Sequence, residues 1–164
     1  MRTKIFFISI SLLFSIWQTK AQSNNEQKSL KGNTENHPVR TLYLSSIEAF
    51  NDGDLELFLA NFSADVKMYG TDGLYEGKAA LRERFKAILQ QFPKKKMDIP
   101  ELKLHILSKE VVMVNFRWKL YPMGQGPSYE GVGSGIYTLQ QDKWVEILEV
   151  ETVTAVDEVL QQKQ

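Results

Sequence analysis

Three glutamates near the C-terminus have the spacing that acid–base chemistry requires. In the run 143–152, Glu149 and Glu151 are two residues apart and share one face of an extended strand, while Glu146 falls on the opposite face. Carboxyl groups beside apolar residues in a cavity can have raised pKa values and exchange protons near neutral pH. If this face points inward, Glu149 or Glu151 is a candidate catalytic acid or base. If it points outward, both are solvated or face a partner; the sequence favours this solvated alternative, which a β-bulge would change.

A second pattern is a row of glycines between two tyrosines. Gly131, Gly133 and Gly135 occupy successive positions on one face of a predicted strand, flanked on that face by Tyr129 and Tyr137. Each glycine inside a strand costs about 0.5–1 kcal/mol relative to alanine, so the fold must require bare backbone here. Two explanations remain open: the missing side chains leave the floor of a cavity free, or they let a bent strand pack closely on a helix.

Aromatic residues from other segments are expected on the same concave surface. Such a lining, with a few hydroxyls, suits a flat and largely apolar small molecule held by stacking and one or two hydrogen bonds. The alternative is that these side chains fill the core, which is the commoner role of aromatic stripes. The candidate ligand-binding residues are Tyr43, Ser46, Phe50, Phe85, Phe116, Trp118, Tyr129, Gly133, Gly135 and Tyr137.

Hydrophobic periodicity predicts the elements that would position these residues. Helical spacing begins at Pro38 and ends at Gly53, a shorter helix follows Asp54, and Pro93 ends a third helix that begins after Gly77. Residues 64–70 and 74–76 form a short strand pair. Alternating residues then predict four strands over 99–107, 111–121, 128–140 and 143–154. The fold class is therefore α+β, with three helices and an antiparallel sheet.

Three short motifs carry a resemblance to a known family. They are Asn51-Asp52-Gly53-Asp54, the helix end at residues 61–65, and Glu76-Gly77-Lys78-Ala79-Ala80-Leu81 at the start of the third helix. Together they resemble the SnoaL-like branch of the nuclear-transport-factor-two-like (cystatin-like) superfamily over residues 38–156. This resemblance implies a half-open cone, in which a curved antiparallel sheet wraps around a long helix, here expected at 78–92. Members include polyketide cyclases, steroid isomerases, dehydratases, non-catalytic ligand binders and assembly modules.

The resemblance also bears on catalysis. The acid–base groups of the steroid isomerases align with Gly70, Ser46 and Gly135, which cannot supply them, so steroid isomerase activity is not expected. Polyketide cyclases use acidic and histidine side chains, but His105 is predicted to point away from the cavity and Asp72 to bond its own turn.

Two functions therefore stay open. The first is binding of a small, largely apolar molecule without chemistry of its own. The alternative is a cyclase-, isomerase- or hydratase-type enzyme that uses Glu149 or Glu151. A third and weaker possibility is a structural or inhibitory partner for another exported protein.

Composition excludes several other classes of site. The 164 residues include no cysteine and two histidines, which excludes disulfides, cysteine-ligated zinc or iron–sulfur centres and multi-histidine metal sites, and no cofactor or metal is expected. The 20 basic residues balance 20 acidic ones, and the one basic run, Lys94-Lys95-Lys96, follows a predicted helix and is expected to face water. Nucleic acid is therefore not an expected partner.

The N-terminus has the pattern of a secretory signal peptide. Arg2 and Lys4 precede the uncharged apolar run 5–17, which is shorter than the roughly 20 residues that span a bilayer. Cleavage is predicted after Ala21, so that 1–21 is a signal peptide and the mature chain is periplasmic or secreted, with no membrane association. Residues 22–37 are predicted to be a flexible polar tether, 38–157 the cone domain and 158–164 a disordered tail. The outer sheet face, mixed in polarity, predicts a homodimer.

Overall fold

The structure is a computed structural model that describes residues 34–123 and 126–157. The predicted signal peptide at 1–21, residues 22–33 of the predicted tether and the predicted tail at 158–164 lie outside the described residues. Residues 34–37 contact the domain, because Arg40 bonds the Thr34 carbonyl oxygen and the His37 ring packs edge-on against Trp144 at 5.1 Å. The compact domain therefore begins a few residues before Pro38.

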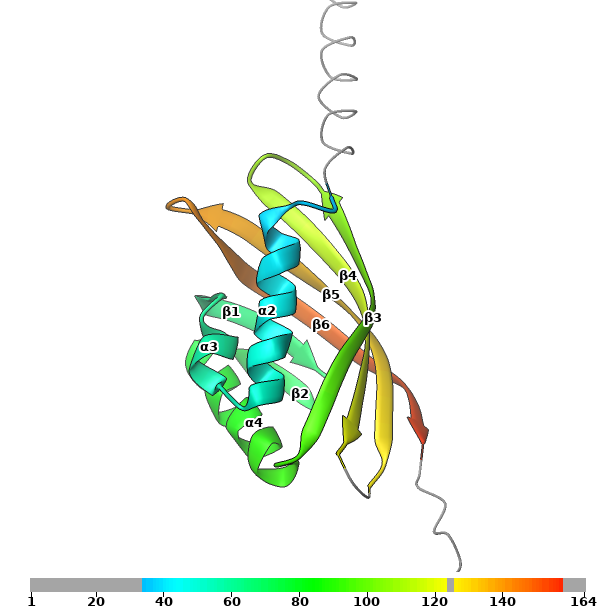
Figure 1. Cartoon of the computed structure of the whole chain (residues 1–164). Coiled ribbons are helices and arrows are strands. Elements are labelled where there is room, and N and C mark those ends of the chain that lie inside the picture. The colour runs from blue at the N-terminus through cyan, green and yellow to red at the C-terminus, as the bar shows by residue number, and fades with distance from the viewer. Residues whose placement is uncertain (1–33, 124–125, 158–164) are drawn as a thin grey trace, which may run out of the picture. The chain divides into compact units, whose positions relative to one another are not determined.

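Three helices lie on one side of the sheet (Figure 1). Helix α2 (Pro38–Asp52) starts at His37, whose ring nitrogen accepts a hydrogen bond from the Val39 amide, and ends at Gly53 in the left-handed conformation. The short helix α3 (Leu55–Leu59) is capped by the Asp54 carboxylate. Helix α4 (Lys78–Gln91) follows. No helix among the described residues is long and apolar enough to cross a membrane.

Six strands form one curved sheet in the order β2-β1-β6-β5-β4-β3. The strands are β1 (Phe62–Gly70), β2 (Gly73–Glu76), β3 (Lys95–Ile106), β4 (Val111–Pro122), β5 (Ser128–Gln140) and β6 (Lys143–Asp157). All neighbours are antiparallel except β1 and β6, which pair in parallel. The α+β class with three helices and a curved sheet is thus confirmed, but the sheet is mixed because β1 and β6 are parallel, whereas an antiparallel sheet was expected.

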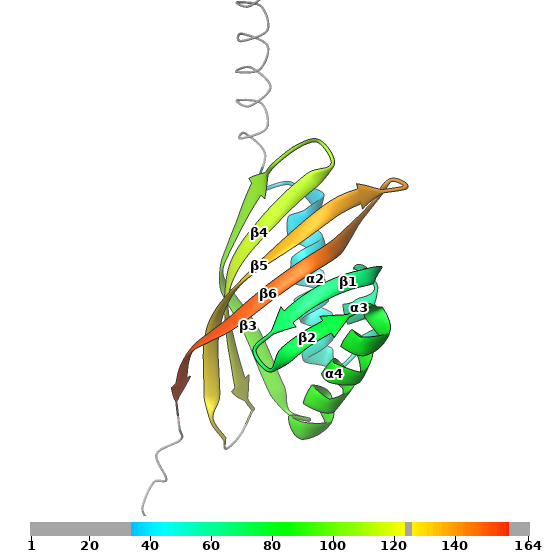
Figure 2. The same cartoon turned by 180° about the vertical axis from the view of Figure 1, so that it is seen from behind.

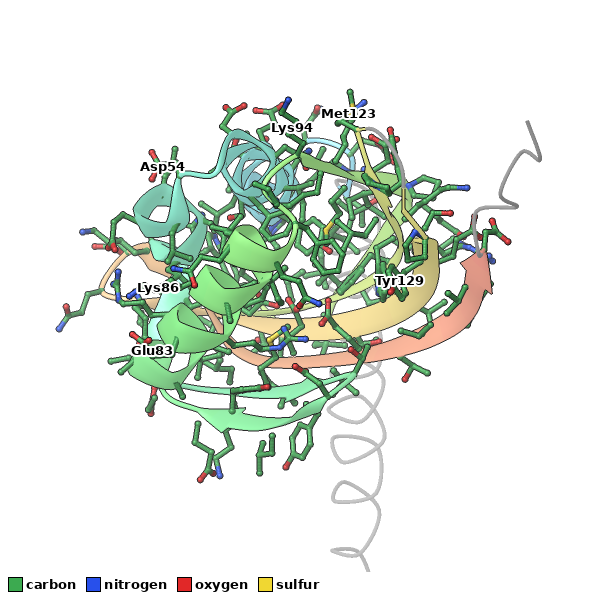
Figure 3. All side chains as sticks on the ribbon, turned by 90° about the horizontal axis from the view of Figure 1, so that it is seen from below. Asp54, Glu83, Lys86, Lys94, Met123 and Tyr129 are labelled. Atoms are coloured by element: carbon green, nitrogen blue, oxygen red, sulfur yellow. The ribbon has the colours of Figure 1, made fainter. Side chains whose placement is uncertain are left out.

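The helices share the concave side of the sheet (Figure 3). Helix α2 packs over β3, β4 and β5, where Val39 and Tyr43 join a core cluster with Phe116, Trp118 and Tyr137. Helices α3 and α4 pack over β1 in a second cluster. The sheet therefore encloses α2 as well as the helix 78–92 that the sequence indicated. The candidate functional site described below lies between these two clusters.

The opposite face of the sheet is not covered by the domain's own helices (Figure 2). His105 lies on this face, exposed and beside Asn115, as predicted. A groove of about 440 Å³ crosses it, with Lys103, Arg117 and Val132 among the lining residues.

The basic run at 94–96 was expected to face water, but one of its three lysines is buried. Lys96 is exposed, but Lys95 is 6% exposed and donates from Nζ to the Phe50 carbonyl oxygen at 2.9 Å. Strand β3 begins at Lys95, four residues earlier than predicted, and this alternation turns the Lys95 side chain inward. Lys95 therefore gives a second hydrogen bond to a carbonyl near the C-terminal end of α2, which also accepts from the Gly53 amide, instead of facing water.

Candidate functional site

Strand β6 places three carboxyl groups on the concave side of the sheet. Glu149 pairs with Gly135 and Glu151 with Gly133, on the face that carries the β4 aromatics. The register shifts around Ile147, so that Glu146 pairs with Tyr137 and its side chain also turns inward. Glu146 and Glu149 are 2% and 6% exposed, and the Glu151 side chain is 13% exposed. The solvated alternative for Glu149 and Glu151 is therefore wrong, and so is the outward placement of Glu146.

The deepest part of this row is short of hydrogen-bond donors. The Tyr137 hydroxyl donates to Oε2 of Glu146 at 2.7 Å, while Oε1 of Glu146 is buried with no donor among the described residues. Burial raises the pKa of Glu146 to about 7 and that of Glu149 well above its usual value. The neighbouring Glu149 carboxyl lowers the pKa of Glu146, while the charges of Glu146 and Glu151 add to the burial that raises the pKa of Glu149. Glu149 is therefore the protonated partner.

An arginine links the outer end of the row to the β1–β2 turn. Arg84, with a side chain only 5% exposed, donates from Nε to Asp72 at 3.0 Å and from Nη2 to Glu151 at 3.4 Å. Burial raises the pKa of Glu151, and the Arg84 guanidinium opposes that rise. Partial burial acts in the same direction on Asp72, but hydrogen bonds from Tyr75 and Arg84 hold the pKa of Asp72 below its usual value. Asp72 and Arg84 are thus a charged pair beside a carboxyl that can gain or lose a proton.

A pocket of about 360 Å³ opens beside Glu151. Its polar and charged lining comes from Thr71, Asp72, Arg84, Gln91 and Glu151, and the rest is mainly aromatic and aliphatic. The volume is within the range of small-molecule sites. The apolar lining residues are Phe50, Phe85, Ile88, Phe92, Met97, Trp118, Leu120, Tyr129 and Val153.

Four of the ten candidate ligand-binding residues line this pocket: Phe50, Phe85, Trp118 and Tyr129. Figure 3 labels Tyr129, which lies on the helix-facing side of the sheet and whose ring approaches Phe92 at 6.5 Å. The other candidates lie elsewhere. Tyr43, Phe116 and Tyr137 are core residues with 4%, 4% and 1% exposure, Ser46 bonds Asn61, Gly135 is buried beside Glu146, and Gly133 borders the outer groove.

The glycine row has a different role from the two that the sequence left open. A Cβ at Gly133 would lie within 3.0 Å of the Phe116 ring, and one at Gly131 equally close to the Trp118 ring. Each ring belongs to the β4 residue paired with that glycine, so the rings lie flat across the bare backbone of β5. At Gly135 the space is taken by the Glu146 carboxyl. The glycines accommodate neighbouring side chains and do not form a pocket floor.

Two residues of the site were not identified from the sequence. Arg84 lies in the apolar stripe of α4, between Leu81 and Phe85 at helical spacing, and a charged residue within such a stripe is a detectable signal. Glu146 was assigned to the other face because simple alternation ignores the bulge. In the described parts of the chain, no group of three ligating side chains is arranged to hold a metal ion.

Comparison with known proteins identifies the family to which the chain belongs. No protein of curated function matches the chain. Among solved structures, a protein of unknown function with a cystatin-like fold from Nostoc punctiforme is 20% identical, with a TM-score of 0.61 over 70% of this chain and 87% of that chain. A hexachlorocyclohexane dehydrochlorinase (LinA) is 12% identical, with a TM-score of 0.65 over 72% and 84%.

A putative calcium/calmodulin-dependent protein kinase II association domain from Xanthomonas campestris is 14% identical, with a TM-score of 0.63 over 71% and 85%. At these identities the shared property is the fold. Residues 44–147 match the family described as the SnoaL-like domain. The chain belongs to the SnoaL-like domain family.

Proposed function

We propose that this domain binds a small, mostly apolar molecule in the pocket beside Glu151. The observation that carries the proposal is the composition of the 360 Å³ pocket, whose aromatic and aliphatic walls surround one cluster of polar groups at Glu151 and Arg84. Apolar walls with a few convergent polar groups are typical of ligand sites, in which the walls supply affinity and the polar groups fix orientation.

A pocket-filling variant tests this proposal. The probe is N-phenyl-1-naphthylamine, an uncharged fluorophore whose emission rises in apolar surroundings. Ile88→Trp would place an indole in the pocket, and we expect it to weaken probe binding at least tenfold. The matched control is Leu57→Trp, at an exposed position of α3 outside the pocket. Equal affinity of both variants and the parent protein would refute the proposal.

A proton-transfer enzyme is the second candidate function. It is favoured by Glu151, which borders the pocket with a raised pKa while Glu149 and Glu146 lie behind it on the same strand. A carboxyl in this setting can remove a proton next to a carbonyl group and return it. The test is exchange of the α-hydrogens of 2-tetralone in D₂O, followed by NMR. Exchange faster than buffer and lost in Glu151→Gln would support catalysis, and exchange at the buffer rate would exclude it for this ketone class.

Export and self-association complete the proposal. The apolar run at 5–17 supports a cleavable signal and a periplasmic or secreted mature protein, which N-terminal sequencing of the exported chain would test. The uncovered outer face, with Val132 and Val150 exposed beside Lys103 and Arg117, supports a homodimer. Sedimentation equilibrium should show a dimer that Val150→Lys disrupts, whereas a monomer at high micromolar concentration would exclude it.

A further inference from the structure

The charges around the concave space do not balance. Two carboxyl groups, those of Asp72 and Glu151, line the pocket, and those of Glu146 and Glu149 are buried behind them on the concave side of β6. Within residues 34–123 and 126–157, Arg84 is the one cation that contacts them. Glu146 has an oxygen with no donor, as noted above. The site therefore has an excess of negative charge whenever its acids are ionised, and protonation is one way to remove it.

Arg84 is not available to bind an anionic ligand. Its Nε and Nη2 donate to Asp72 and Glu151, and Nη1 lies 3.3 Å from the sulfur of Met68. The guanidinium carbon also lies 5.1 Å from the centre of the Tyr75 ring and 4.9 Å from that of Phe85. An anion would have to displace a carboxylate from this arrangement and would add to the existing negative charge.

The pocket walls suit a cation better. Beside Glu151, the wall includes Phe92, Trp118 and Tyr129, and aromatic faces attract cations as well as apolar groups; the Phe50 ring, also in this wall, already has the Lys95 ammonium over it. Resting on the proposed function, we infer that the pocket selects a ligand with a positively charged amine on an aromatic or apolar body, the amine lying against Glu151. The bound amine supplies a positive charge next to the row of carboxyls formed by Glu146, Glu149 and Glu151, here called the acid row.

The groups around Glu151 determine how this binding depends on pH. Arg84 contacts it from α4, and the charge of Glu151 interacts with Asp72 in the β1–β2 turn, with Glu146 and Glu149 on β6 and with the Tyr43 hydroxyl on α2. Because the pKa of Glu151 and that of Glu149 are raised, both acids hold protons more strongly than ordinary glutamates. A bound amine favours the ionised forms, so its binding releases protons and its affinity increases as the pH rises.

Three matched probes test this inference by isothermal titration calorimetry. They share a naphthalene body and differ in charge: 1-naphthylmethylamine is a cation, 1-naphthalenemethanol is neutral and 1-naphthoate is an anion. At pH 7.5 we expect the amine to bind at least tenfold more tightly than the alcohol, and the naphthoate more weakly than both. Between pH 5.5 and 7.5 the affinity for the amine should rise while that for the alcohol stays level. Titrations in phosphate and in Tris should differ in heat by the protons released.

Two variants test whether Glu151 is the group that causes the preference for the amine. Glu151→Gln should reduce amine affinity about tenfold and leave alcohol affinity within twofold. Glu101→Gln is the matched control, since Glu101 lies by the outer groove and pairs with Lys103. It should change neither affinity.

The outcomes separate this inference from the proposed function. If the alcohol binds as tightly as the amine, or the amine fails to bind where N-phenyl-1-naphthylamine binds, the charge preference is refuted and the pocket's binding role stands. If the fluorophore and all three probes fail to bind, the proposed function itself is refuted.

Discussion

Replacing Glu146 by glutamine should change how the stability of this domain depends on pH. The Glu146 carboxyl is 2% exposed and its pKa is raised from 4.5 to about 7 by burial. Below pH 4.5 the folded and unfolded chains both hold this proton. Between pH 4.5 and 7 the folded chain keeps the proton that the unfolded chain has released. The free energy of unfolding therefore falls as the pH rises through this window, and it stays lowered above pH 7.

The magnitude follows from the size of the shift. Each pKa unit is worth about 1.4 kcal/mol, so ionisation of Glu146 costs the folded state about 3 kcal/mol by neutral pH. Glutamine has nearly the same shape, and its carbonyl oxygen can still accept the Tyr137 hydrogen bond. It cannot ionise. Glu146→Gln should therefore remove about 3 kcal/mol of the loss in unfolding free energy between pH 4.5 and 7.5.

Urea unfolding at half-unit pH steps measures this effect. The free energy of unfolding of the parent protein should fall across this pH window. In Glu146→Gln the dependence of this free energy on pH should be smaller by the contribution of about one proton. Glu149→Gln should flatten it as well, because the two carboxyls share a proton. Glu101→Gln, on the outer face, is the control and should keep the parent slope. An unchanged slope in Glu146→Gln would refute the raised pKa of the buried Glu146 carboxyl.

Three further substitutions test packing and buried contacts. Gly131→Ala should destabilise the domain by about 1–3 kcal/mol in urea unfolding, since its Cβ would overlap the Trp118 ring; no loss would contradict the ring's placement. Lys95→Met should cost about 1 kcal/mol because the Phe50 carbonyl oxygen loses one of its two donors and keeps the Gly53 amide, while the exposed Lys96→Met changes the urea midpoint little; similar midpoints would argue against the buried contact. Asn51→Ala removes two hydrogen bonds between α2 and β3, so we expect a loss of about 2 kcal/mol, and an unchanged thermal midpoint would disprove it.

The elements could be predicted because local chemistry determines them. Gly53, Asp54 and Pro93 mark helix ends, and alternation along β4 assigns Phe116 and Trp118 to the concave side correctly. The order of the strands in the sheet, by contrast, could not be predicted from local chemistry. Nothing local to β1 indicates that it pairs in parallel with β6, since this contact joins residues about 80 positions apart and depends on how the whole sheet closes.

The candidate site was predicted only in part, for two physical reasons. Face assignment by alternation fails wherever the register shifts, and one such shift separates Glu146 from Glu149. Alternation also does not distinguish a side chain that borders a pocket from one packed under it. Phe116 and Trp118 share a face, yet Trp118 lines the pocket while Phe116 is packed against the Tyr43 ring at 5.1 Å. The centre of the pocket therefore lay nearer to α4 than the sequence indicated.

The glycine row and the acid row are one feature of the fold. The Glu146 carboxyl occupies the space that a side chain at Gly135 on the neighbouring strand would take. The neighbouring glycines provide space for the β4 rings, so rings, bare backbone and carboxyls form a single layer beneath α2 and α4. A larger residue at Gly135 would displace the Glu146 carboxyl directly. The protonation of the buried carboxyls on β6 therefore depends on the packing of β5.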